Sequence, residues 1–404
     1  MRISFSIYLL CILLACSKEH PEIELNNKSI EDAYMQNNIE ASKRFQSIAF
    51  DTTNIDEPRE RFKIVHISDA HLSAYSASNH YTNPNNLIES VRFANQPELR
   101  VNAILSTGDN ISNAPFGSAS KYMGSFFEHL YEKNSIPTFS CYGNHDCNTD
   151  NVDFSQALNY PLLLHHIIQE SGTNEIYFYK DLKNPMGGTI RIISLNMLDQ
   201  HVIKHSMFMR AVYSQEQIDW LGDVALKEGM TENHSILILN HFAFQPTRAD
   251  LSTFLRDADF LHQWYVVPEI VEAFRMRKSI KKVFPSLQNV ETPLQVDFDF
   301  TNSSGDFICY LGGHNHAYAT FEIKGYENES SELKPQQMIL ATNMAPTDMG
   351  RAYNQVERID NTTSSNAFNL YALDTKERKL YITFFGAHKP KGKPDYPSIQ
   401  VLNY

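Results

Sequence analysis

Five short polar motifs in this 404-residue chain contain the side chains best suited to bind metal ions. They are Asp69-Ala70-His71, Gly108-Asp109-Asn110, Gly143-Asn144-His145-Asp146, Asn240-His241 and Gly313-His314-Asn315-His316. Carboxylate, imidazole and amide groups offer nitrogen and oxygen ligands and no thiolate, a set that Mn, Fe and Zn all accept. The motifs therefore predict a metal site and leave the identity of the metal open.

Each motif follows a short apolar run that is typical of a β-strand. The predicted strands span 62–68, 101–107, 137–142, 189–196, 235–240, 307–311 and 337–342, and helical patterns lie near 39–49, 86–94, 118–131, 154–169 and 214–227. The segments 366–372 and 379–385 predict a C-terminal hairpin. Strands alternating with helices indicate an α/β fold, in which ligands bind at the carboxyl ends of the strands.

The spacing within two motifs places a pair of ligands together. Asp69 and His71 are two residues apart, as are His314 and His316. Side chains alternate between the two faces of an extended chain, so each pair is expected on one face. Gly108 allows the chain to turn sharply before Asp109.

In this order the motifs resemble the signature of the calcineurin-like metallophosphoesterases, from about Phe62 to the C-terminal hairpin. The resemblance implies a two-sheet β-sandwich flanked by helices. It implies one metal held by Asp69, His71 and His316, a second metal held by Asn144, His241 and His314, and Asp109 as a bridge between them. His145 would face the substrate instead of binding metal.

The chemistry implied by this resemblance is hydrolysis of phosphomonoesters or phosphodiesters of small or nucleotide substrates. Two divalent ions outweigh two aspartates and a bridging hydroxide by one positive charge, which attracts phosphate. The hydroxide would attack phosphorus in line with the leaving oxygen, and His145 would protonate that oxygen. The residues after Asp109, Asn110-Ile111-Ser112-Asn113, lack the Asp and Arg of the protein Ser/Thr phosphatase branch, and Asp146 replaces its Glu.

Two other functions remain open from the residues alone. The domain could bind a phosphorylated ligand without turnover, because a fold does not guarantee activity. It could be a nuclease with a basic wall formed by Arg275-Met276-Arg277-Lys278 and Lys281-Lys282, although the net charge of −12 argues against a nucleic-acid partner. No ligand of the signature is missing, which favours an active enzyme. The oligomeric state is not predicted.

The N-terminus predicts export. Residues 3–15 form an apolar run that is too short to span a bilayer, and it ends at Leu13-Leu14-Ala15-Cys16. This resembles a bacterial lipobox, which implies a signal peptide over 1–15 and a lipid on Cys16. We therefore expect the protein to be anchored to a bacterial membrane, on its periplasmic or cell-surface face. An ordinary export signal or a membrane-anchoring segment is the alternative.

The predicted organisation follows from these boundaries. Residues 16–60 would form a tether and entry segment, 61–390 the phosphoesterase domain and 391–404 a C-terminal tail. The stretch 245–306 is long for a connection and is expected to form a lid or side wall. Substrate specificity is expected in this stretch and in the loops 72–85, 148–155 and 199–209.

The remaining histidines and cysteines receive plainer interpretations. His66 lies within a predicted strand and is expected to be structural, His165-His166 lie in a helical pattern, and either His201 or His205 could touch substrate. Cys141 and Cys147 flank the third motif, where a disulfide is one option in an oxidising compartment.

Overall fold

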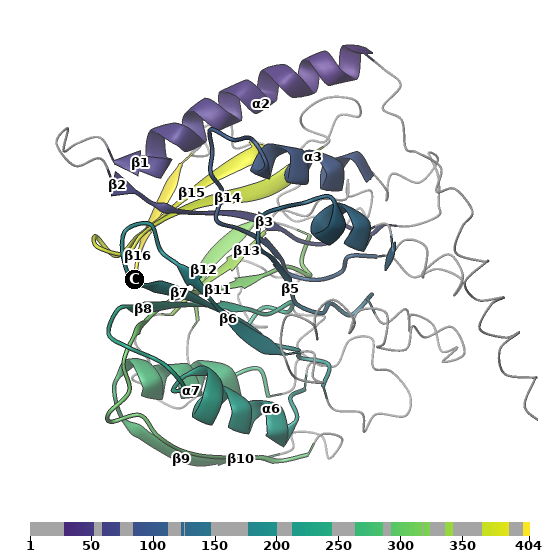
Figure 1. Ribbon diagram of the computed structural model, residues 1–404. Helices are drawn as coiled ribbons and strands as arrows, with labels where there is room; N and C mark the ends of the chain where they lie inside the picture. The colour runs from purple at the N-terminus through teal and green to yellow at the C-terminus, as the bar shows by residue number, and fades with distance from the viewer. Residues whose placement is uncertain are drawn as a thin grey trace, which may run out of the picture.

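The computed structural model describes thirteen stretches of the chain. These are 28–51, 59–72, 84–111, 123–124, 126–146, 177–199, 212–244, 263–285, 292–316, 318–323, 336–341, 366–387 and 399–404. Two six-stranded sheets face each other in them, with helices on the outer faces (Figure 1). The α/β class and the two-sheet sandwich flanked by helices are confirmed.

The first sheet has the strand order β16-β15-β14-β3-β4-β5. Its strands are β3 (Phe62–Ile67), β4 (Ala103–Ser106), β5 (Thr138–Ser140), β14 (Ala367–Asp374), β15 (Lys379–Gly386) and β16 (Gln400–Asn403). β3, β4 and β5 run parallel, whereas β14 to β16 are antiparallel. The expected hairpin is confirmed as β14 and β15.

The second sheet has the order β12-β13-β11-β8-β7-β6. Its strands are β6 (Phe178–Lys183), β7 (Thr189–Ser194), β8 (His234–Leu239), β11 (Asp306–Gly312), β12 (Ala319–Ile323) and β13 (Gln336–Leu340). The four inner strands are parallel and both edges are antiparallel. β8 is buried along its whole length, because parallel strands covered on both faces are apolar throughout.

Helices cover the outer face of each sheet. α2 (Lys28–Ala49) and α3 (Pro84–Ala94) lie over the first sheet, and a π-helical turn, η1 (Glu128–Glu132), lies close to α3. α6 (Gln215–Trp220), its π-helical continuation η4 (Leu221–Ala225), and α7 (Val266–Arg275) lie over the second. A short pair, β1 (Phe50–Asp51) and β2 (Arg59–Glu60), joins α2 to β3.

The helix expected near 39–49 begins earlier than predicted, at Lys28. Its second half packs onto the first sheet through Ala41, Phe45 and Ile48, and the Phe45 ring lies 6.4 Å from that of Phe93. The second half of α2 is therefore part of the packed domain. No helix among the described residues is long and apolar enough to cross a membrane.

Ser214 is the N-cap of α6, and Gln217 stands three residues after it. The Ser214 side chain accepts a hydrogen bond from the backbone N–H of Gln217 at 3.1 Å, as an N-cap does. The Gln217 side chain does not return to Ser214. Instead it bonds both backbone groups of Asn196, at 2.8 Å each. Gln217 thereby fastens α6 to the chain that leaves β7.

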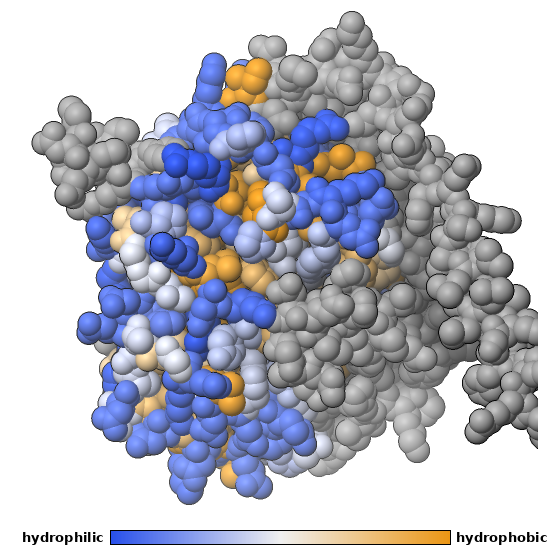
Figure 2. All heavy atoms as spheres, in the orientation of Figure 1, coloured by the Kyte–Doolittle hydropathy of each residue, from blue (hydrophilic) through white to orange (hydrophobic). Residues whose placement is uncertain are grey.

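The described part of 245–306 forms a helix and a hairpin on the outer side of the second sheet. α7 is followed by the hairpin of β9 (Ser279–Phe284) and β10 (Leu294–Asp299), which packs against α6 and α7. β10 alternates buried and exposed residues, so one face of the hairpin meets the helices and the other meets water. The surface over these elements is mostly hydrophilic with scattered apolar spots (Figure 2).

Candidate metal centre

All five motifs follow the carboxyl end of a strand, as predicted. Asp69 and His71 follow β3, Asp109 follows β4, and Asn144 follows β5. In the other sheet, His241 follows β8, and His314 and His316 follow β11. Parallel pairing of β3 with β4 and β5, and of β8 with β11, brings these loops to one end of the sandwich. Both sheets therefore contribute to a single site.

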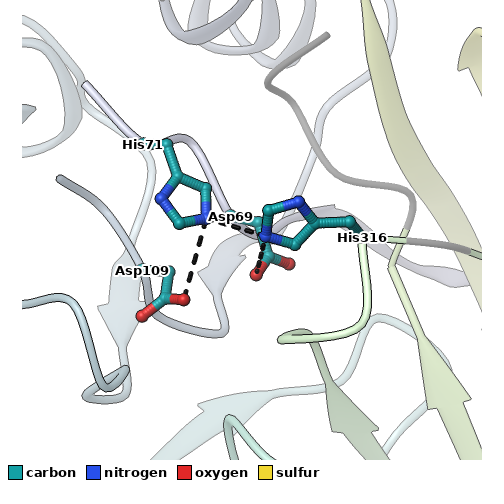
Figure 3. A group of neighbouring side chains, drawn as sticks. All are labelled: Asp69, His71, Asp109 and His316. Atoms are coloured by element: carbon teal, nitrogen blue, oxygen red, sulfur yellow. Dashed lines mark hydrogen bonds and ion pairs between the residues drawn. The ribbon is translucent and has the colours of Figure 1, made fainter. Parts of the chain in front are cut away.

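The first group contains Asp69, His71, Asp109 and His316, whose donor atoms lie within 4.8 Å of one another (Figure 3). The Nε2 atoms of His71 and His316 face each other at 2.8 Å. Asp69 Oδ1 lies 3.6 Å from His316 Nε2, and Asp109 Oδ2 lies 3.7 Å from His71 Nε2. Nitrogen and oxygen atoms thus converge on one point.

The second group contains Asp109, His241 and His314. Asn144 joins it, because its Oδ1 lies 3.0 Å from His241 Nε2 and 3.0 Å from His314 Nδ1. Asp109 Oδ2 lies 3.2 Å from His241 Nε2. The structure therefore brings all seven predicted ligands together in two groups that share Asp109.

The two oxygens of Asp109 are in different positions. Oδ1 accepts a hydrogen bond from the backbone N–H of His145 at 2.8 Å. Oδ2 faces His71 in the first group and His241 in the second. Oδ1 is therefore anchored by the backbone, and Oδ2 lies between the two groups of candidate ligands.

The backbone at the ligands is strained, which the sequence pattern did not indicate. Asp69, His71, Asp109, His314 and His316 have φ angles of 52°, 46°, 51°, 68° and 51°. Residues other than glycine rarely adopt this left-handed backbone conformation, and those that do cluster at functional sites. The extended-chain reason given for pairing His314 with His316 was wrong: the strand has ended, and the two rings belong to different groups.

Two glycines allow the loops after β4 and β5 to touch. Gly108 has a φ of +91°, and a Cβ added to it would lie 2.6 Å from the backbone nitrogen of Gly143. A Cβ on Gly143 would lie 2.1 Å from the backbone nitrogen of Asp109 and 2.3 Å from its Oδ1. Any side chain at either position would push the bridging aspartate out of place.

The electrostatics of the groups fit a cation. Burial, together with the neighbouring histidines, holds the pKa of His71 well below its ordinary value, and burial also lowers the pKa of His316. Their facing rings are therefore neutral, and a neutral imidazole can direct a lone pair at a metal. Asp69 and Asp109 supply the negative charge beside them. The residues present thus fit the metal ions that the fold family implies.

Asp109 and His241 show the same demand for positive charge. Burial would raise the pKa of the Asp109 carboxyl, but His241, His145 and His71 hold it well below its ordinary value. Burial lowers the pKa of His241, and the carboxylates of Asp109 and Asp69 outweigh that effect and raise it to about 9. The Asp109 and Asp69 carboxylates therefore favour a positive charge at the His241 position.

His145 lies beside the first group without joining it. Its Nε2 is 3.9 Å from Asp109 Oδ2, its ring meets the edge of the His71 ring at 4.7 Å, and its side chain is 20% exposed. His145 is therefore a partly exposed imidazole at the rim of the buried cluster, outside both groups of candidate ligands.

The other singled-out residues have clear places or lie outside the described chain. His66 is fully buried and structural as expected, bonded to Tyr371 at 2.7 Å and Thr107 at 3.0 Å, and burial lowers its pKa to about 3. Cys141 is buried with a free thiol. Outside the described residues lie Cys16, Cys147, His165, His166, His201, His205, most of loop 72–85, loop 148–155 and most of loop 199–209.

The basic wall of the nuclease hypothesis is not at the site. Arg277 bonds the backbone oxygen of Gly305, directly before β11, whereas His314 follows the other end of that strand. Lys281 pairs with Asp297, and Lys282 pairs with Glu269 at 2.9 Å. Lys281 and Lys282 therefore each have a carboxylate partner away from the metal centre.

The supporting contacts were the part that the motifs did not reveal. Thr107 accepts a hydrogen bond at its backbone oxygen from His241 Nδ1 at 2.6 Å, which leaves Nε2 to face the second group. The backbone N–H of His314 bonds Asp69 Oδ1 at 2.9 Å. Asp146 accepts bonds from Asn110 and Gly143. Their sequence signal was only proximity to a predicted ligand.

Comparison with known proteins places this chain in a family. A family model for calcineurin-like phosphoesterases matches residues 62–318, more than half of the chain. No curated protein sequence matches. The structure of purple acid phosphatase PPD1 from yellow lupin (Lupinus luteus) seeds aligns with a TM-score of 0.47 and 10% identity over 85% of this chain and 54% of the lupin chain. A structure of PhoD aligns with a TM-score of 0.46 and 8% identity, over 85% of this chain and 68% of that one.

This chain therefore spans about half the length of the lupin phosphatase. The family match covers the strands and loops that carry all seven candidate ligands, from Asp69 to His316. The chain belongs to the calcineurin-like phosphoesterases, a family of hydrolases that act on phosphate ester bonds.

Proposed function

We propose that this phosphoesterase uses two metal ions to hydrolyse phosphomonoesters or phosphodiesters of small or nucleotide substrates. The observation that carries the proposal is Asp109, whose Oδ2 faces both His71 and His241 at 3.7 and 3.2 Å. A carboxylate oxygen shared by two groups of nitrogen and oxygen donors suits a pair of metal ions. Mn, Fe and Zn all fit these donors.

When bound, the ions would hold phosphoryl oxygens and supply a hydroxide nucleophile near neutral pH. The chain's own part is to fix their ligands. Asp69, His71 and His316 would hold the first ion, Asn144, His241 and His314 the second, and Asp109 both. His314 contributes twice, because its backbone N–H also anchors Asp69.

His145 is the proposed general acid. Its Nε2 is on the partly exposed side of the site, near the bridging carboxylate. A proton on this ring could be delivered to the leaving oxygen, which stabilises an alkoxide as the ester bond breaks.

One experiment separates this proposal from its two alternatives. The purified full-length protein is assayed with added Mn²⁺ against p-nitrophenyl phosphate, its bis ester and single-stranded DNA. Turnover of either small ester supports the proposal, and the ratio of the two assigns monoester or diester preference. Cleavage of DNA alone would favour a nuclease. Bound metal with no turnover of any ester would indicate an idle domain that binds a phosphorylated ligand.

We also propose that the chain is exported and anchored to a membrane through lipid on Cys16. The support is the lipobox-like end of the apolar run before that cysteine. Labelling cells with a lipid-precursor analogue tests it: wild type should take up label and require detergent for release, and Cys16→Ala should not. An unlabelled wild-type protein would indicate an ordinary signal peptide.

A further inference from the structure

Asp146 is a fully buried carboxylate that lies behind the candidate metal centre and belongs to neither group of ligands. Its Oδ1 accepts hydrogen bonds from the backbone N–H of Asn110 at 2.7 Å and of Ile111 at 3.4 Å. Its Oδ2 accepts from the backbone N–H of Gly143 at 2.8 Å and from the Asn110 side chain at 3.1 Å. One side chain therefore bonds two separate loops.

The two loops are those that carry the bridging aspartate and the amide ligand. Asn110 directly follows Asp109, and Gly143 directly precedes Asn144. Asp146 thus holds the backbone next to each of these ligands. Four hydrogen bonds on its two oxygens fix this side chain between the loops, so it acts as a clamp.

Asn110 completes the clamp from the opposite side. It is buried, its Oδ1 accepts a hydrogen bond from Ser106 Oγ at 2.8 Å, and its Nδ2 bonds Asp146. Ser106 is the last residue of β4, so the clamp is tied to the sheet itself. The glycine contact between the loops leaves no room for them to approach further, and the clamp prevents them from separating.

We propose that Asp146, with Asn110, is a positioning residue that sets the distance between Asp109 and Asn144 and thereby the spacing of the two metals. No Lys or Arg within the described chain pairs with Asp146, and the hydrogen bonds to its two oxygens come from N–H groups. If Asn replaced Asp146, its amide N–H group would face the N–H donors on one side of the clamp and could not accept their hydrogen bonds.

The test compares Asp146→Asn with a matched control, Asp374→Asn. Asp374 is equally buried and also accepts two backbone N–H bonds, from Lys376 and Glu377, but it lies at the opposite end of the sandwich. Titration calorimetry of the full-length protein measures the affinity of each variant for Mn²⁺. Loss of a contact that supports metal ligands typically weakens metal binding about 10–100-fold, and that is the expected change for Asp146→Asn. Asp374→Asn should bind Mn²⁺ as wild type does.

A second readout distinguishes positioning from general destabilisation. Two Mn²⁺ ions bridged at a fixed distance give an exchange-coupled paramagnetic resonance signal, and Asp146→Asn should replace it with the signal of isolated ions at saturating Mn²⁺. If Asp146→Asn does not fold, Asn110→Ser removes only the side-chain part of the clamp and should give a smaller change in the same direction. Unchanged affinity and an unchanged coupled signal in the folded variant would overturn the inference.

The inference rests on the proposed dinuclear centre, and the two can fail separately. A wild-type protein that binds no Mn²⁺ would refute the metal centre and the clamp's role with it. A wild-type protein that binds two ions, beside an Asp146→Asn variant that binds them equally well, would refute the clamp alone.

Discussion

The two ends of the sandwich treat buried charge differently. At the amino end of β3, Arg61 pairs with Asp374 at 3.0 Å, and their side chains are 7% and 0% exposed. At the carboxyl end, Asp69 and Asp109 are buried, and within the described residues their ion-pair partners are histidines, with no Lys or Arg among them. Burying a charge costs free energy unless it is paired. At the amino end Arg61 is the paired cation, and at the carboxyl end a bound metal ion would be the paired cation.

The largest effect is expected for Asp109→Ala. Removing the bridging carboxylate takes a ligand from both groups at once, so metal should be lost at both positions and turnover should fall to background. Elemental analysis and an ester assay on the same preparation measure this. Two metals per chain retained in the variant would show that Asp109 is not a bridge.

The next effect concerns His145. General acid catalysis contributes roughly 10²–10⁴-fold, and the contribution grows with the basicity of the leaving group. His145→Asn should keep both metals, lose most of its kcat on alkyl phosphate esters, and lose clearly less on p-nitrophenyl esters. Equal losses on both ester classes with metal intact would leave His145 as a stabiliser of phosphate charge instead.

A third prediction contrasts the two ends directly through stability. In metal-free protein, Asp374→Asn should lower the free energy of unfolding by about 3 kcal/mol, because Arg61 cannot lose its charge. Asp109→Asn should cost much less, because its partner His241 can release a proton and become neutral. Urea unfolding of both variants in the presence of a chelator makes the comparison. Similar losses would mean that the site end is a structural ion-pair network.

Near neutral pH the smallest effect is expected at His66, which is held neutral by burial. Its pKa in the folded protein, about 3, is below its ordinary value of 6.5. Between these two pH values the unfolded chain is protonated at His66 and the folded chain is not. Its neutral form contributes fully above pH 6.5, and stability is lost as the pH falls from there toward 3, by about 1.4 kcal/mol per pH unit. His66→Gln should unfold in urea with a shallower dependence on acid pH. An identical slope would show that His66 is not the group responsible.

The sequence predicted the catalytic end of the fold better than its edges. Strands β3, β4, β5, β8 and β11 were predicted because each lies in a short β-rich segment that ends at a polar motif. The edge strands β6, β12 and β16 were missed. β6 has one buried residue in six and β16 has none, so their identity as strands depends on pairing with neighbours rather than on their own pattern.

At the site, residue types predicted which side chains gather, whereas local spacing did not predict their geometry. Asp69 and His71 share a group, as expected, but both have left the extended strand. His314 and His316 have the same spacing and serve different groups. The contacts that hold these positions, such as Thr107 with His241 and Asn110 with Asp146, join residues of different motifs. Only the folded arrangement reveals them.

The most direct measurement of the central claim is a crystal of the full-length protein soaked with Mn²⁺ and examined by anomalous scattering. The account predicts two peaks roughly 3.5–4 Å apart. One should lie among Asp69, His71 and His316, the other among Asn144, His241 and His314, with Asp109 between them. A single peak, or no peak within these two groups, would contradict it.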